Sequence, residues 1–301
     1  ILVTLWVIVT CTFFMMKNLP GTPFDAERFS IMTPQQQERV LEMYGLNDSL
    51  PMQYVKYIKN MLKGDLGTSF TYVNQDVSKV ITGRLGPSAL IGIQAVLIGL
   101  AIGLILGILA AWKHNSGIDY FTMILAVLGV SVPNFVAAAL LQYYIGLKWG
   151  ALPVGFWTGW NCSVLPSIAL SFSATAMVAR FMRTEMLDVL DQDYIVTARA
   201  KGLSQMKVLM RHAVRNSILP VVTILGPIVV NLMTGSLAVE NIFSIPGIGS
   251  LFVDCIKAND YPVIMGITIF YAAFYMLIVL LVDLAYSLID PRIRLAKGKE
   301  S

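Results

Sequence analysis

Long apolar runs are the feature that most limits what this chain can fold into. Five of them contain few charges, and each is long enough to cross a hydrocarbon layer of about 30 Å. They cover residues 87–112, 121–147, 163–182, 218–242 and 263–289. In the first run Gly99, Gly103 and Gly107 recur at every fourth residue, which predicts the close approach of another helix.

A sixth apolar run, residues 1–16, opens the chain. At about 1.5 Å per residue it reaches only about 24 Å, so we interpret it as a shortened first span whose native start lies upstream. A signal-peptide core is the alternative, but no small-residue cleavage site follows before Lys17. Only 13% of the residues are charged, against about 25% in soluble domains. The sequence therefore predicts an all-α, polytopic membrane protein with six transmembrane helices in one transmembrane domain, 1–301.

Basic residues in the short loops predict the orientation, because such loops are rich in lysine and arginine on the cytoplasmic side. One loop side carries Lys113, Arg183, Arg199, Lys201, Lys207, Arg211, Arg215, Arg292, Arg294, Lys297 and Lys299. The opposite short loops carry only Lys148 and Lys257. We therefore expect both termini in the cytoplasm, residues 17–86 outside as a helical cap, and residues 183–217 inside.

The external cap is expected to contain two amphipathic helices. The first helix is expected to begin with a capping threonine, a proline at the first helical position and a glutamine that completes a capping box, and to end at a glycine. These residues are Thr33, Pro34, Gln36 and Gly45. The second helix is expected over 51–63, with Gly64 at its end. The cap either packs over the spans or contacts an external partner.

Polar residues within the spans are candidates for a translocation pathway. We select Asn134, Asn231, Thr234 and Glu240. The last three could share one stripe of the fifth span, although simple bonding between helices explains them equally well. Asp283 is the one carboxylate well inside a predicted span, near its inner end. A proton-coupled transporter usually needs a carboxylate near mid-membrane with relay partners, so the pattern disfavours that mechanism.

Several site types find no support in the sequence. The chain has no Gly-x-x-x-x-Gly-Lys-Ser/Thr loop for nucleotide phosphates. His114 and His212 stand apart from acids and cysteines at metal-ligand spacing. The cysteines are scattered; Cys162 and Cys255 fall on one predicted side, so they are either free thiols or a disulfide. The basic stripe lacks the interleaved aromatics of nucleic-acid grooves. We expect no catalytic site, metal site or nucleic-acid partner.

The polar segment 193–220 is more organised than a connecting loop requires. Asp193 fits an N-cap, residues 194–201 form about two turns of helix, and Gly202 can take the left-handed conformation that ends it. Ala198 and Ala200 would keep this helix slim enough for a partner to close around it.

A second helix should follow Ser204 as its cap. Its apolar face is expected to contain Met206, Leu209, Met210 and Ala213, and its cationic ridge Lys207, Arg211 and Arg215. Anchoring to anionic lipid headgroups explains the charge, whereas docking of a cytosolic protein also explains the alanines and the glycine stop.

The same residues carry a family resemblance. The motif Tyr-Ile-Val-Thr-Ala-Arg-Ala-Lys-Gly-Leu at 194–203 resembles the coupling-loop signature of the peptide-importer branch of ABC transporter permeases. Further matching motifs lie at 20–24, 64–70, 211–216, 219–220, 242–249, 260–261 and 290–294. The resemblance covers nearly the whole chain. Val196 stands where that branch often has an arginine, and the acid of the general importer loop is missing.

The resemblance implies the type I ABC importer permease architecture: a second related permease, two ABC ATPases that use ATP and magnesium, and an extracytoplasmic substrate-binding protein. It implies peptide import across the cytoplasmic membrane, with nickel chelates or oligosaccharides as alternatives, and no cofactor in this chain. The ATPase-coupling residues would be Tyr194, Thr197, Ala198, Arg199, Ala200, Lys201, Gly202 and Leu203. The candidates facing the binding protein would be Phe243, Ser244, Ile245, Pro246, Gly247, Ile248 and Gly249. An ion-coupled transporter and a membrane scaffold that transports nothing are the other classes considered.

Overall fold

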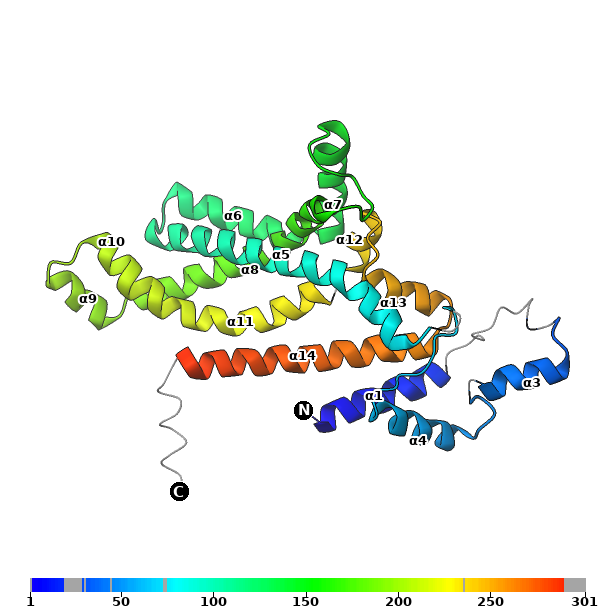
Figure 1. Ribbon diagram of the computed structural model, residues 1–301. Helices are drawn as coiled ribbons and strands as arrows, with labels where there is room; N and C mark the ends of the chain where they lie inside the picture. The colour runs from blue at the N-terminus through cyan, green and yellow to red at the C-terminus, as the bar shows by residue number, and fades with distance from the viewer. Residues whose placement is uncertain are drawn as a thin grey trace, which may run out of the picture. The chain divides into compact units, whose positions relative to one another are not determined.

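The computed structural model describes residues 2–18, 29, 31–43, 45–72, 75–234 and 236–289, and helices dominate this part of the chain (Figure 1). Within the described residues the only β pairing is an isolated bridge between Thr68 and Asp76. The helices at the start of the chain are α1 (Leu2–Lys17), α3 (Pro34–Met43), α4 (Leu50–Met61) and α5 (Val77–Trp112). Those at its end are α12 (Leu237–Ile242), α13 (Ile248–Lys257) and α14 (Tyr261–Ile289). The predicted all-α class is confirmed.

Between them lie α6 (Gly117–Ser131), α7 (Asn134–Leu141), the π-helix η1 (Gln142–Lys148) and the short 3₁₀ turn η2 (Trp160–Ser163). The chain then continues through α8 (Val164–Leu190), α9 (Asp193–Ala200), α10 (Gln205–Val208), the π-helix η3 (Leu209–Val214) and α11 (Arg215–Met233).

Four helical stretches of the described chain are long and apolar enough to cross a membrane: Val77–Trp112, Trp160–Leu190, Gln205–Ile242 and Tyr261–Val282. A fifth consists of Gly117–Ser131 and Asn134–Lys148, which are bent by 100° at the break between them. The bend falls at Pro133, because proline interrupts the hydrogen bonds of a helix. The apolar helix Val3–Lys17 is shorter. A polytopic membrane protein is confirmed, and the count of six spans stays a prediction.

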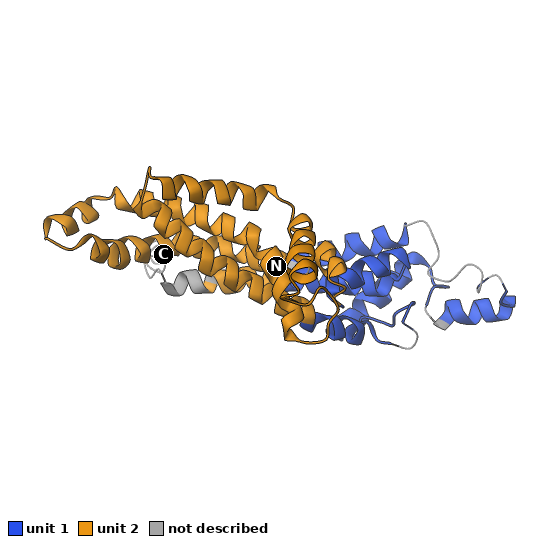
Figure 2. Cartoon of the chain, turned by 90° about the horizontal axis from the view of Figure 1, so that it is seen from above, with its two compact units in different colours: residues 1–86, 246–274 blue, residues 87–245, 275–301 orange. Residues whose placement is uncertain are grey.

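The chain divides into two compact units, whose boundaries fall within α5, between α12 and α13, and within α14 (Figure 2). Residues 1–86 and 246–274 form unit 1, and residues 87–245 and 275–301 form unit 2. In the core of unit 1, α5 packs against α13 and α14 through Val77, Ile81, Ile248, Leu251 and Ile267.

The cap helices of unit 1 follow their sequence signals. The Thr33 N–H donates to Gln36 Oε1 over 2.9 Å, and the Gln36 N–H donates to Thr33 Oγ1 over 3.4 Å, which completes the predicted capping box. Gly45 has φ +64°, as a helix-ending glycine requires. The predicted last residue of α3, Tyr44, lies outside the described residues. The second helix spans Leu50–Met61, slightly short of the predicted 51–63 at its end.

Unit 2 is built around α8, which packs against α6, α7 and α11 (Figure 1). The glycine repeat of α5 faces α8: a Cβ atom at Gly99 would lie 2.7 Å from Ala174 Cβ. At Gly107 it would lie 2.6 Å from the Ala179 carbonyl oxygen. Such distances leave no room for a side chain, so the predicted close approach is confirmed. Cys162 in unit 2 and Cys255 in unit 1 are each buried free thiols.

Candidate functional site

The candidate coupling segment, residues 193–220, begins just after α8 ends. The chain turns through Asp191 and Gln192, and α9 starts at Asp193 (Figure 1). Gln192 is the N-cap, with extended backbone (φ −77°, ψ 147°), so the prediction that Asp193 is the cap is wrong by one residue. Asp193 instead lies in the first turn, where its negative charge interacts favourably with the positive end of the helix dipole.

The inner face of α9 holds it against the rest of the segment. Ile195 and Ala198 are buried with Val208, and Val189, Leu190 and Leu203 pack around them. Ala198 is therefore part of this small core. The prediction that Ala198 leaves room for a partner is wrong. Ala200 is exposed. A small residue is needed at Ala198 because α10 packs there.

The turn after α9 is formed by its glycine. Gly202 has φ +76°, a conformation that L-residues adopt with strain. Its N–H donates to Arg199 O over 2.9 Å, and the Leu203 N–H reaches Ala198 O over 3.4 Å. This is the predicted glycine stop, and it reverses the chain into α10.

The outer face of α9 is exposed. Val196 has 59% of its surface exposed, and Thr197, Arg199, Ala200 and Lys201 are also exposed. An apolar valine, an alanine and two cations thus share one short, anchored helix. A protein groove could contact this face without unfolding anything.

Tyr194 is tied back to the next helix, because its hydroxyl accepts a hydrogen bond of 3.0 Å from Asn216 Nδ2. This bond links the start of α9 to α11. Among the predicted coupling residues, Tyr194 therefore contributes to positioning α9 as well as to its surface.

The second half of the segment differs from the predicted pattern. Ser204 lies at the N-cap of α10 as expected. Val208, Leu209 and Ala213 are buried, whereas Met206 and Met210 are 50% and 53% exposed. The prediction that both methionines lie on the buried face is wrong. Because α9 packs against Val208, the buried seam is rotated toward residues 208 and 209.

The predicted cationic ridge Lys207, Arg211 and Arg215 is exposed along this stretch. The π-helix at Leu209–Val214 carries Arg211 in the middle of the ridge. The two exposed methionines and the three cations thus form an amphipathic outer surface.

A polar cluster that sequence reasoning missed ties α6 to α8. Arg183 donates from Nε to Asp119 Oδ1 over 2.6 Å and from a terminal nitrogen to Asp119 Oδ2 over 2.8 Å. His114 Nδ1 lies 3.1 Å from Asp119 Oδ2 and 3.2 Å from the same arginine. The side chain of Asp119 is 2% exposed. The sequence predicted that His114 stands apart from acidic residues, and this prediction is wrong.

Bidentate pairing fixes both partners in orientation as well as in distance. Arg183 lies on α8, the helix that leads into α9. The pair with Asp119 therefore helps to position the start of the candidate coupling segment. The available sequence signal was that both charges fall at span ends on the same predicted side of the membrane.

The pathway candidates do not form one group. Asn134 is half-buried at the start of α7, and Asn231 is exposed on α11. Thr234 donates back to Val230 O over 2.9 Å. Glu240 lies on the separate helix α12, is 2% exposed and accepts a 2.7 Å hydrogen bond from Ser88 Oγ. The expected shared stripe is wrong, because α11 ends at Met233.

The predicted outer loop is largely buried. Phe243 and Ile245 are 1% and 2% exposed in unit 2. In unit 1, Gly247, Ile248 and Gly249 are buried. Only Ser244 is exposed, with φ +51°, and Pro246 is half-buried. A partner could contact little more than Ser244 and Pro246 here.

No group of three or more histidine, cysteine, aspartate or glutamate side chains with metal-binding geometry occurs in the described part of the chain.

Comparison with known proteins identifies the family. A family described as "Binding-protein-dependent transport system inner membrane component" matches residues 103–295, and its N-terminal counterpart matches residues 1–85. The chain is 45% identical to the dipeptide transport system permease protein DppB of Lactococcus lactis over 98% of its own length and 96% of that protein. It is 39% identical to the oligopeptide transport system permease protein OppB of Salmonella typhimurium, over 97% and 95% of the two chains.

Among solved structures, the fold is similar to a chain of the MetNI methionine ABC transporter in an inward-facing conformation. The TM-score is 0.60 at 14% identity, covering 70% of this chain and 96% of that one. The likeness supports the fold, and the sequence matches support the family. The chain belongs to the family of binding-protein-dependent transport system inner membrane components.

Proposed function

We propose that this chain is the membrane permease subunit of an ATP-driven importer of short peptides, and that α9 is its contact with the ATPase. One observation carries the proposal: α9 is anchored on one face by Ile195 and Ala198, and its other face is exposed. A helix held in this way can transmit a push or pull to α8 and α11.

The partners follow from the family and from what this chain lacks. It has no loop for nucleotide phosphates, so two separate ATPases would supply the energy. A second related permease would complete the pathway, and an external binding protein would deliver the substrate. Peptides are the proposed substrates because the relatives named above are peptide permeases.

The proposed orientation places the coupling segment in the cytoplasm. The exposed cations of that segment, Lys201, Lys207, Arg211 and Arg215 among them, obey the positive-inside rule. Both chain ends would then be cytoplasmic and residues 17–86 external. The chain itself would carry out no catalysis.

The test compares an exposed alanine of α9 with an exposed glutamine at the start of α10. Ala200→Arg adds bulk and charge on the exposed face, and should leave the folded chain in the membrane while abolishing ATP-driven peptide uptake by the complete complex. The matched variant Gln205→Arg changes an exposed residue just beyond the turn and should transport normally. Full uptake by Ala200→Arg would contradict the coupling assignment.

Ala198→Arg is a poorer test, because it disrupts the core beneath α9. Co-purification adds an independent check. A pair of Walker-motif ATPases and a second permease should accompany the chain, whereas a lone chain that transports would favour an ion-coupled transporter.

A further inference from the structure

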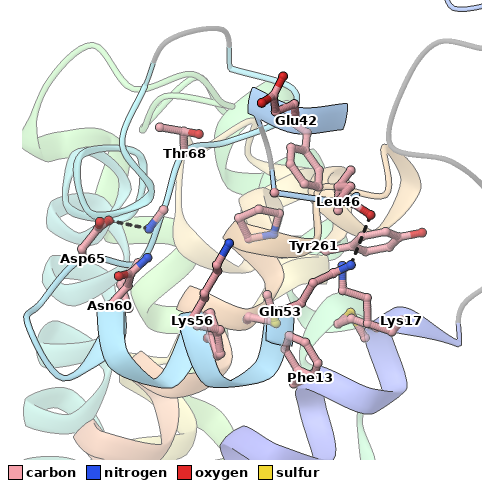
Figure 3. A pocket seen from close by; sticks show the side chains of 18 residues that line it. Phe13, Lys17, Glu42, Leu46, Gln53, Lys56, Asn60, Asp65, Thr68 and Tyr261 are labelled. Carbon is pink, nitrogen blue, oxygen red and sulfur yellow. Dashed lines mark hydrogen bonds between the residues drawn. The ribbon is translucent and has the colours of Figure 1, made fainter. Parts of the chain in front are cut away.

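Unit 1 contains a pocket of about 360 Å³ between α1, α4, the loop after α4 and the start of α14 (Figure 3). This volume lies near the lower end of the usual range for small-molecule sites, about 300–1,000 Å³. The pocket therefore suits a small ligand better than a folded segment of another protein.

The pocket has an apolar floor and a charged rim. The floor is lined by Phe13, Met16, Leu66, Phe70 and Met265, and the rim by Lys17, Glu42, Gln53, Lys56, Asn60, Asp65 and Thr68. Stacking of Phe13 on Tyr57, with ring centroids 5.7 Å apart, joins α1 to α4 beneath it. Packing between helices thus fixes the floor before any ligand arrives.

Charges of opposite sign are available on the rim. Lys56 is held by Asp48 at 2.5 Å. Among the described residues, neither Lys17 nor Asp65 forms an ion pair. The ammonium group of Lys17 lies 5.8 Å from the centre of the Phe13 ring, which keeps it over the floor. Asp65 accepts one hydrogen bond, 2.8 Å from the Gly67 N–H, and its carboxylate retains further acceptor capacity.

Figure 3 shows Lys17 and Asp65 on opposite sides of the pocket, with Lys56 between them. Tyr57 also lines the pocket. Burial raises the pKa of Tyr57, so its hydroxyl stays protonated and can donate. The pocket therefore offers hydrogen-bond donors on one side, a hydrogen-bond acceptor on the other side and an apolar surface between them.

We propose that this pocket binds a short peptide with free termini, its carboxylate at Lys17, its ammonium at Asp65 and an apolar side chain on the floor. Two residues of extended chain span about 7 Å, a length compatible with a pocket of this size. The proposal rests on the proposed function only for placing the pocket outside the membrane, where peptides arrive.

The test measures peptide binding to the complete purified complex in lipid nanodiscs, without ATP and without the external binding protein. Saturation-transfer NMR with Ala-Phe as probe suits weak binding. Lys17→Gln should weaken Ala-Phe binding about tenfold, equivalent to about 1.4 kcal/mol. The amidated peptide should bind wild type about tenfold more weakly, and Lys17→Gln should not weaken it further.

Asp65→Asn keeps an oxygen for the Gly67 N–H and tests the other end. It should weaken Ala-Phe about tenfold and leave N-acetyl-Ala-Phe unchanged. Lys59→Gln, on α4 but outside the pocket lining, is the matched control and should bind like wild type.

Unchanged Ala-Phe binding in both pocket variants would overturn the proposal, as would no Ala-Phe binding to the wild type. If Lys17→Gln weakened only the association of the external binding protein, the pocket would receive an acidic protein side chain, and the peptide site would be wrong. ATP-driven uptake by the same wild-type complex tests the proposed function separately. Uptake without binding in this pocket rejects the site alone.

Discussion

The helix α9 and the loop 243–249 were both expected to face partners, but they differ in how much of their surface is exposed. On α9, Val196, Arg199, Ala200 and Lys201 remain exposed while Ile195 and Ala198 are buried. In the loop, Phe243, Ile245 and Ile248 are buried, and Ser244 is the exposed residue. A family motif can therefore reflect packing as readily as contact, and burial distinguishes the two.

The largest expected effect concerns the base of α9. Arg183→Ala would leave Asp119 buried without its cation, which typically costs about 3–5 kcal/mol. We expect a strong fall in the thermal unfolding midpoint of the purified chain. Asp119→Asn combined with Arg183→Gln removes both charges and should recover much of the loss. Equal destabilisation by the single and double changes would mean that the pair acts through packing alone.

The next effect tests the buried loop. Phe243→Ala removes a fully buried aromatic ring, and such changes cost about 3–5 kcal/mol when a cavity remains. We place it second because lipid or neighbouring side chains can partly fill the space. The control Ser244→Ala should be neutral in thermal unfolding. A stable Phe243→Ala variant that had lost only its response to the external binding protein would restore the loop as a contact surface.

A smaller effect is expected at the turn. Gly202→Ala forces a Cβ atom into the left-handed conformation, which costs about 1–2 kcal/mol, although nothing lies within 4 Å of that Cβ position. Thermal unfolding should therefore change modestly. Gly64→Ala, at φ +81° with equally open surroundings, is the matched control for stability. Transport should fall only in Gly202→Ala, and equal transport in the two variants would separate this turn from coupling.

The smallest effect on stability is expected at the exposed face itself. Val196→Ser changes a surface residue, so unfolding should shift by less than about 0.5 kcal/mol. Peptide uptake should nevertheless fall, because the ATPase groove would lose an apolar contact. Normal uptake would show that Val196 is outside the contact.

Local signals predicted much of the fold. The capping box at Thr33 and Gln36 and the stop at Gly202 each depend on neighbouring residues, and each is present. The glycine repeat of α5 also predicted a close contact, although its partner α8 was not identified. Signals of this kind are readable because the chemistry lies within one or two helical turns.

Most of the failures involve contacts between different helices. Asp119 and Arg183 pair across 64 positions, and neither has a local pattern that names the other. Met206 and Met210 fit an apolar face by period, but the packing of α9 against Val208 decides which side is buried. The loop at Phe243 is rich in glycine and proline, which predicts a turn but not whether it is covered.

Site-specific photo-crosslinking in native membranes tests most directly whether α9 contacts the ATPase. A benzoylphenylalanine is placed at Val196 on the exposed face of α9, and separately at Ser244 in the outer loop. If α9 is the ATPase contact, Val196 crosslinks to a Walker-motif ATPase and Ser244 does not. No ATPase adduct from Val196, or an adduct from Ser244 alone, would contradict it.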